Sequence, residues 1–130
     1  THWRGSLHQD HNYTHDIVKQ ALFKAGLPAF KREHPSHYPS ALLFSENWED
    51  VEGYQPDIYL DVTDVFDDYL KLLKTHALMR ERYSSFRYYD YYEALGQMRG
   101  CLGGFGKAVT LMRTHSVFTY ERQSGLLLNR

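Results

Sequence analysis

Three histidines and two aspartates lie within residues 6–16, SLHQDHNYTHD, and they are the side chains of this chain best suited to chemistry. His8 and His11 are three residues apart, and His15 follows His11 by four. On a helix this spacing can place all three rings on one face, and in a turn His8 and His11 can still converge on one ion. Imidazole nitrogens bind Zn²⁺, and a catalytic zinc keeps an open position. The stretch predicts either part of a metal or catalytic site or a polar turn before a helix.

Asp10 lies between His8 and His11, and several roles are open to it. It could bind a metal, or hold a ring nitrogen of a histidine and so set the tautomer of that ring. It could equally be an acidic residue at the start of a helix, stabilised by the helix dipole. A second pair of histidines, in HPSH at 34–37, lies among prolines, and this setting indicates an exposed loop rather than a site.

The composition is that of one globular domain with a core. Of the 130 residues, 42% are hydrophobic and 24% are charged. Lys and Arg number 15 against 16 Asp and Glu, so the net charge of -1 offers no electrostatic case for a nucleic-acid or anionic-membrane partner. The single cysteine, Cys101, excludes an internal disulfide framework and favours a reducing, cytoplasmic compartment. No apolar run approaches the roughly 20 residues of a membrane span.

Local patterns predict the elements that must position these side chains. Apolar residues spaced by three and four predict a helix of about 12 residues within 12–28, with Asn12 or Thr14 near its N-cap and Gly26 and Pro28 as its stop. Strands are predicted at 41–46, 57–63 and 116–121. Two more helices are predicted, at 64–79 with Asp64 as its N-cap and at 91–112. This order predicts an α/β fold, with 1–130 as a single domain or a fragment of one.

The segment SENWED at 45–50 follows a predicted strand, where α/β proteins place ligand contacts. Trp48 could stack on a sugar, and Glu46 or Asn47 could bond its hydroxyls. The alternative is a capped loop with a packed tryptophan. RYYDYY at 87–92 presents the same choice between a sugar-stacking or subunit surface and a half-buried aromatic cluster.

Glycines recur in MRGCLGGFG at 98–106. Their spacing fits no phosphate-binding loop, so they predict that another backbone packs closely against this segment. Arg99, within it, could form an ion pair or bind a substrate anion.

Four segments in this order are similar to the carboxy-terminal part of the PIG-L or LmbE-like zinc-dependent N-deacetylases. They are HQDHNYTHDIVKQAL, LLFSENWED, PDIYLDVTDVFDDYLKLLKTH and YYEALGQMRGCLGGFGKAV, and the resemblance covers roughly residues 4–112. Gln9 stands where the family usually has proline. The resemblance implies the distal part of a Rossmann-like deacetylase domain, a three-layer α/β/α fold with a partly parallel sheet. It also implies removal of an N-acetyl group from an N-acetylglucosamine-type sugar or sugar conjugate.

By this resemblance, His11 is a zinc ligand, His8 polarises the acetamide oxygen or delivers a proton, and Asp10 orients and charges His8. The family's Ala-His-Pro-Asp-Asp motif, which supplies the remaining zinc ligands and the general base, is absent from the sequence. We therefore expect a preceding N-terminal segment or another chain to complete the site. A non-catalytic carbohydrate-binding or subunit-interface module, with a vestigial histidine cluster, is the rival function. A structural metal site is a second rival, and a homo-oligomer is left open.

Overall fold

The computed structural model of the protein describes residues 1–80 and 85–114. Its strands are β1 (Leu43–Ser45), β2 (Ile58–Asp61) and β3 (Ala108–Arg113). Its helices are α1 (Gln9–Gly26), the short 3₁₀ helix η1 (Thr63–Val65), α2 (Phe66–Leu73), α3 (Ala77–Arg80) and α4 (Tyr88–Gly103). The predicted α/β class is confirmed. The strand predicted at 116–121 lies outside the described residues.

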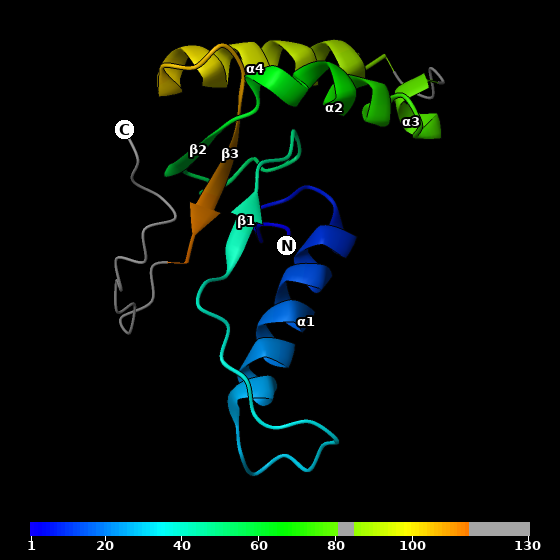
Figure 1. Cartoon of the computed structure of the whole chain (residues 1–130). Coiled ribbons are helices and arrows are strands. Elements are labelled where there is room, and N and C mark those ends of the chain that lie inside the picture. Colours follow the sequence, from blue (N-terminus) through cyan, green and yellow to red (C-terminus); the bar gives the residue numbers. More distant parts are fainter. Residues whose placement is uncertain (81–84, 115–130) are drawn as a thin grey trace.

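The three strands form an antiparallel sheet in the order β1-β3-β2. Phe44 pairs with Met112 on one side of β3, and Tyr59 pairs with Thr110 on the other. The expected partly parallel sheet is therefore not what these strands form, although an isolated parallel bridge joins His2 to Ser45 at the edge. The reason lies in the connection between β2 and β3. Because α2 carries the chain away from the sheet and α4 carries it back (Figure 1), β3 begins beside the end of β2 and runs against it.

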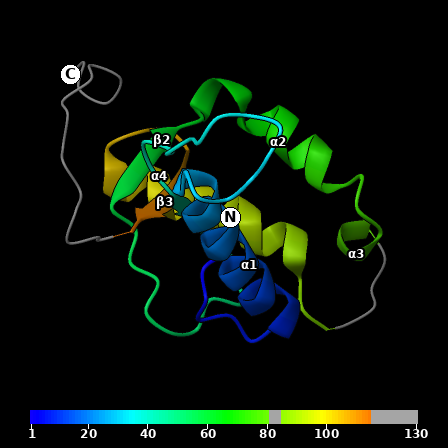
Figure 2. The ribbon, with the colours of Figure 1, turned by 90° about the horizontal axis from the view of Figure 1, so that it is seen from below.

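The core lies on the sheet, where Phe66 of α2 packs on Gly96 of α4 and Phe44 of β1 contacts His15 of α1 and Trp3. It holds Phe44, Phe66, Leu70, Ala108 and Met112, of which Phe44 is completely buried. The α4 helix packs on β2 and β3, and α2 packs on α4. Both views place α3 at the far end of α2, away from the strands (Figures 1 and 2). In the part of the chain that is described, no helix has the length and apolarity needed to cross a bilayer.

The first helix begins earlier than the sequence predicts. It starts at Gln9, and His8 is its N-cap in place of Asn12 or Thr14. The ring nitrogen Nδ1 of His8 accepts a hydrogen bond from the Asp10 N–H at 3.2 Å. The side-chain oxygen of a Ser or Asp N-cap accepts the same kind of hydrogen bond. The Thr14 hydroxyl instead donates back to the Asp10 carbonyl within the helix. Consequently the histidine-rich stretch forms the first two turns of α1.

Two other predicted helices differ from those observed. The helix predicted at 64–79 is divided into η1, α2 and α3, and Asp64 provides no side-chain cap. The helix predicted at 91–112 ends at Gly103, and its last part belongs to β3. Gly104 has φ +77°, a left-handed conformation that glycine adopts at low cost, and it turns the chain out of α4.

Candidate functional site

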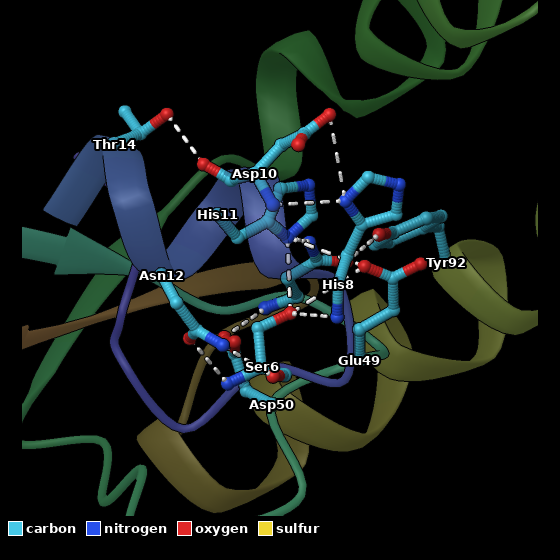
Figure 3. A network of polar contacts seen from close by, with 10 residues as sticks. Ser6, His8, Asp10, His11, Asn12, Thr14, Glu49, Asp50 and Tyr92 are labelled. Carbon is cyan, nitrogen blue, oxygen red and sulfur yellow. Dashed lines mark hydrogen bonds and ion pairs between the residues drawn. The ribbon is translucent and has the colours of Figure 1, made fainter.

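The candidate site lies where the first turn of α1 meets the loop that follows β1 (Figure 3). Ser6 anchors this junction and is buried. Its backbone N–H and C=O both bond the Asn12 side-chain amide, and its hydroxyl accepts the His8 N–H at 3.2 Å. The Leu7 N–H donates to the Glu49 carbonyl at 2.9 Å, and this bond ties the two segments together. Ser6 was not predicted as part of the site, because it carries no motif of its own.

His8 and His11 come together as the sequence predicts. Their ring centroids are 5.1 Å apart. Because His8 Nδ1 accepts the Asp10 N–H, the neutral ring of His8 carries its proton on Nε2. The Asp10 carboxylate lies 3.8 Å from the same Nδ1 and is 81% exposed, so its attraction for a protonated His8 is screened by solvent.

His11 is the better enclosed of the two rings and is 22% exposed. Three groups surround its Nδ1: the Ser6 hydroxyl at 3.1 Å, the Asn47 side-chain nitrogen at 3.0 Å and a Glu49 carboxylate oxygen at 3.2 Å. Asn47 and Glu49 come from the loop after β1, more than thirty residues along the chain. Glu49 was not predicted, since no local pattern marks it as a companion of the histidines.

A further histidine, His2, stacks on His11. The two rings are parallel within 2° and their centroids are 4.0 Å apart. Burial lowers the pKa of His2, and the neighbouring His11 lowers it further. His2 therefore presents a neutral flat face that fixes the plane of the His11 ring. His15, the third histidine of the sequence motif, does not join this group. It is buried, contacts the His2 carbonyl through Nδ1 at 3.0 Å and stacks on Phe44.

Asp50 closes the loop beneath the two rings. One of its carboxylate oxygens accepts the Asn47 N–H at 2.9 Å, whereas the other is buried and has no hydrogen-bond partner among the described residues. Burial raises the pKa of Asp50 to about 6, against the effect of the Asn47 N–H, and the nearby Glu46 and Glu49 raise it further. The loop thus holds a carboxyl group that changes charge in mildly acidic solution.

Trp48 points into an aromatic cluster. Its ring stacks on Phe86 at a centroid distance of 4.5 Å and meets Tyr88 edge-on at 5.4 Å. This is the packed tryptophan of the alternative interpretation, and stacking of Trp48 on a sugar stays a prediction. Tyr92 connects the cluster to the histidines, because its hydroxyl donates to the Asn47 side-chain oxygen at 3.0 Å.

Glu46 and Arg99 bind each other rather than facing solvent. Arg99 makes two hydrogen bonds to the Glu46 carboxylate, one of them at 2.9 Å, and the Thr110 hydroxyl donates to the same carboxylate. The ion pair that the sequence allowed for Arg99 is therefore present. A cavity of about 240 Å³ lies beside it, with aromatic and aliphatic walls that include Tyr69, Tyr92, Leu95 and Leu111.

The described residues can supply part of a metal shell. They contain no group of three or more His, Cys, Asp or Glu side chains arranged to hold an ion. His11 nevertheless fits one ligand position, because a carboxylate at its Nδ1 is the usual companion of a metal-binding histidine. His8, whose Nδ1 is the helix cap, offers an N–H at Nε2 instead. The described residues can therefore offer one metal ligand, His11, and one hydrogen-bond donor, the Nε2–H of His8.

No protein family matches the chain, and no curated protein matches it significantly.

Proposed function

We propose that this chain is the distal part of a zinc-dependent N-deacetylase of the PIG-L or LmbE-like kind. Its substrate would be an N-acetylglucosamine-type sugar or sugar conjugate in the cytoplasm. One observation carries the proposal: His8 and His11 lie side by side, each with its Nδ1 already bonded inside the protein. The hydrogen bonds of the two rings within the described residues are at Nδ1, and we assign the Nε2 atoms to external partners.

His11 would hold the metal through Nε2. When bound, zinc supplies Lewis-acid polarisation of the amide and a water nucleophile of lowered pKa. Glu49 and Ser6 would support the ring from the opposite nitrogen, and the flat stack with His2 would keep it in place. The described residues hold no complete ligand set. We propose that a preceding segment or another chain supplies a second histidine and an aspartate.

His8 would act on the acetamide oxygen. Its Nε2–H can donate to the oxygen as negative charge develops there, and stabilisation of this kind often contributes more to acyl-transfer catalysis than any other effect. A protonated His8 could also deliver a proton to the departing amine. Asp10 would orient the ring, because its N–H donates to His8 Nδ1 and its carboxylate lies 3.8 Å from the same atom; a protonated ring would lose that N–H bond.

The other predicted substrate contacts are all engaged inside the protein. Asn47 and Trp48 belong to the loop that reaches His11, where the Asn47 amide bonds His11 and Tyr92 and the Trp48 ring stacks on Phe86. Glu46 and Arg99 satisfy each other's charges, and a substrate group would have to displace part of that ion pair to bind them. A sugar contact at any of these four residues would require that part of these internal contacts be displaced, and binding of substrate by them stays a prediction.

A carbohydrate-binding or subunit-interface module is the second candidate. The observation in its favour is the cluster of Trp48, Phe86 and Tyr88 next to Asn47, together with an incomplete metal shell among the described residues. Tyrosine and tryptophan are enriched at binding surfaces because they bury large areas at little entropic cost. Such a module would bind sugar or a second subunit without metal and without acetate release.

The deciding experiment measures zinc content and acetate release from N-acetylglucosamine conjugates in the full-length natural gene product. We expect about one zinc per chain, lost in His11→Ala and kept in His34→Ala, which removes an exposed loop histidine. His8→Ala should keep the zinc and lower the rate of acetate release by about 10²–10⁴-fold. A protein that holds no zinc and releases no acetate, yet binds the sugar, is the second candidate instead.

A further inference from the structure

The cavity beside the ion pair of Glu46 and Arg99 has a volume of about 240 Å³. The helices α2 and α4, the strand β3 and the end of β1 contribute to its wall. Protein interiors pack as closely as organic crystals and hold few voids larger than a water molecule, so a space of this size exceeds an ordinary packing gap. The lining residues Tyr92, Leu95 and Leu111 are only half-buried, which places the cavity near the surface.

The polar part of the wall is the ion pair itself. Arg99 Nε and the Thr110 hydroxyl both donate to one oxygen of the Glu46 carboxylate, and Arg99 Nη2 donates to the other. A carboxylate offers about four lone-pair positions, so Glu46 keeps acceptor capacity beyond these three bonds. An anionic ligand would have to displace Glu46 from Arg99, whereas a neutral N–H or O–H group would not. This part of the wall therefore favours an uncharged hydrogen-bond donor.

Aromatic and aliphatic side chains form most of the remaining wall. Burial raises the pKa of both Tyr69 and Tyr92, so their phenols stay neutral and this region is poorly hydrated. An apolar cavity of about 150 Å³ binds benzene, and the larger volume here accommodates roughly a bicyclic ring system. Aromatic rings also gain from offset or edge contacts with tyrosine. The size and the lining together favour a planar aromatic ligand.

We propose that this cavity binds an uncharged, planar aromatic molecule about the size of indole, whose single N–H or O–H group donates to the Glu46 carboxylate. The inference rests on the cavity and requires neither a metal nor the proposed deacetylase. Tyr92 belongs to both places, because it lines the cavity and its hydroxyl donates to Asn47 in the network around His11 (Figure 3). Among the described residues, the cavity wall contains no histidine, so occupation of the cavity and any binding at His11 are separate events.

The test is a titration of the chain with indole in the presence of EDTA, followed by NMR of labelled Leu and Val methyl groups. We expect saturable shifts at the lining residues Leu95, Val109 and Leu111, because an aromatic ring shifts the resonances of the methyl groups it contacts. Benzofuran has the shape of indole, with an oxygen in place of the N–H. It should bind about 10–100-fold more weakly, since a hydrogen bond to a charged group is lost. Glu46→Gln should reduce that difference to about fivefold, the effect of a neutral acceptor.

A bulky substitution in the wall supplies the second arm of the test. Leu95→Trp should fill part of the cavity and abolish the indole shifts. The matched control is Leu102→Trp, the same substitution on α4 at a side chain that is 63% exposed and does not line the cavity, and it should bind indole like the native chain.

The inference is overturned if the native chain shows no saturable shifts at the lining residues, if benzofuran binds as tightly as indole, or if Leu95→Trp still binds indole fully. Should Leu95→Trp fail to fold by circular dichroism, the location of the shifts and the comparison of the two ring compounds on the native chain still decide.

Discussion

The charged form of Asp50 is destabilised by burial, in a loop whose other carboxylates have charged or polar partners. Its neighbours Glu46 and Glu49 find an arginine and a histidine respectively, whereas one oxygen of Asp50 is buried without a hydrogen-bond partner among the described residues. Its pKa of about 6, against an ordinary value of 3.8, means that the folded chain binds this proton more tightly than the unfolded chain does. Stability from this group is therefore present at low pH and is lost as the pH rises from about 4 to 6.

We expect Asp50→Asn to raise the free energy of unfolding at pH 7 by about 1–2 kcal/mol, because the substitution removes a poorly solvated charge and keeps an acceptor for the Asn47 N–H. It should also flatten the loss of stability between about pH 4 and 6. Urea unfolding at several pH values measures both effects. Glu52→Gln is the matched control and should keep the native pH slope. An Asp50→Asn protein that retains that slope would contradict the assignment.

At the scale of elements, the junction of α4 and β3 depends on glycine. A Cβ placed on Gly100 would lie 2.7 Å from the Gly106 carbonyl oxygen and 2.9 Å from the Lys107 Cα, both backbone atoms that cannot turn aside. The close packing predicted for this segment is present here, but the backbone that meets Gly100 is the segment's own end rather than another part of the chain. At Gly96 the neighbour is instead the Phe66 ring. The contact at Gly100 lets β3 return directly onto α4 and so enter the sheet between β1 and β2.

We expect Gly100→Ala to destabilise the fold by about 1–3 kcal/mol, even though alanine favours helix by about 1 kcal/mol over glycine. The backbone of Gly106 must move away, and β3 moves with it. Chemical denaturation measures the change. Gly104→Asn serves as the control, since that position is open and left-handed and asparagine tolerates both. Equal stability of Gly100→Ala and the native chain would show that the turn is free to shift.

At the scale of the whole molecule, α1 is joined to the rest chiefly at its first half. Its buried residues are His15 and Gly26, whereas Ile17 is 65% exposed and Phe23 is 68% exposed. The second half of the helix extends away from α4 (Figure 1). The candidate site therefore lies at the end of the helix that packs on Phe44, whereas the far end contacts the loop that follows it, where the Tyr38 ring lies against Gly26.

We expect the amides of α1 after Ile17 to exchange with solvent at least about tenfold faster than those of α4 and β3, because few buried contacts oppose their local opening. Hydrogen exchange followed by mass spectrometry tests this order. His15→Ala should quicken exchange throughout α1, since it removes the stack on Phe44 and the contact to the His2 carbonyl. His34→Ala, at an exposed position, is the control. Equal protection of α1 and α4 would mean that the helix is better anchored than its burial indicates.

Local sequence signals determined the existence of α1, β1, β2, α2 and α4, because spacing of apolar residues and capping preferences act within a few residues. These signals gave the wrong result where a tertiary contact determined the secondary structure. His8 caps α1 although histidine is not a preferred cap, and the Val109 and Thr110 segment is a strand because β1 and β2 flank it. The prediction of one continuous helix over 91–112 used only the local sequence, which contains no information on the pairing of β3 with β1 and β2.

Chain order alone also determines which residues of the candidate site are neighbours along the backbone, namely His8, Asp10 and His11. The folded structure, in contrast, is what brings Glu49 and Asn47 to His11, stacks His2 on it and pairs Arg99 with Glu46. The physical reason is the range of the interactions. A turn of helix is set by hydrogen bonds between neighbours, whereas those contacts form only once the strands have paired and brought distant loops together.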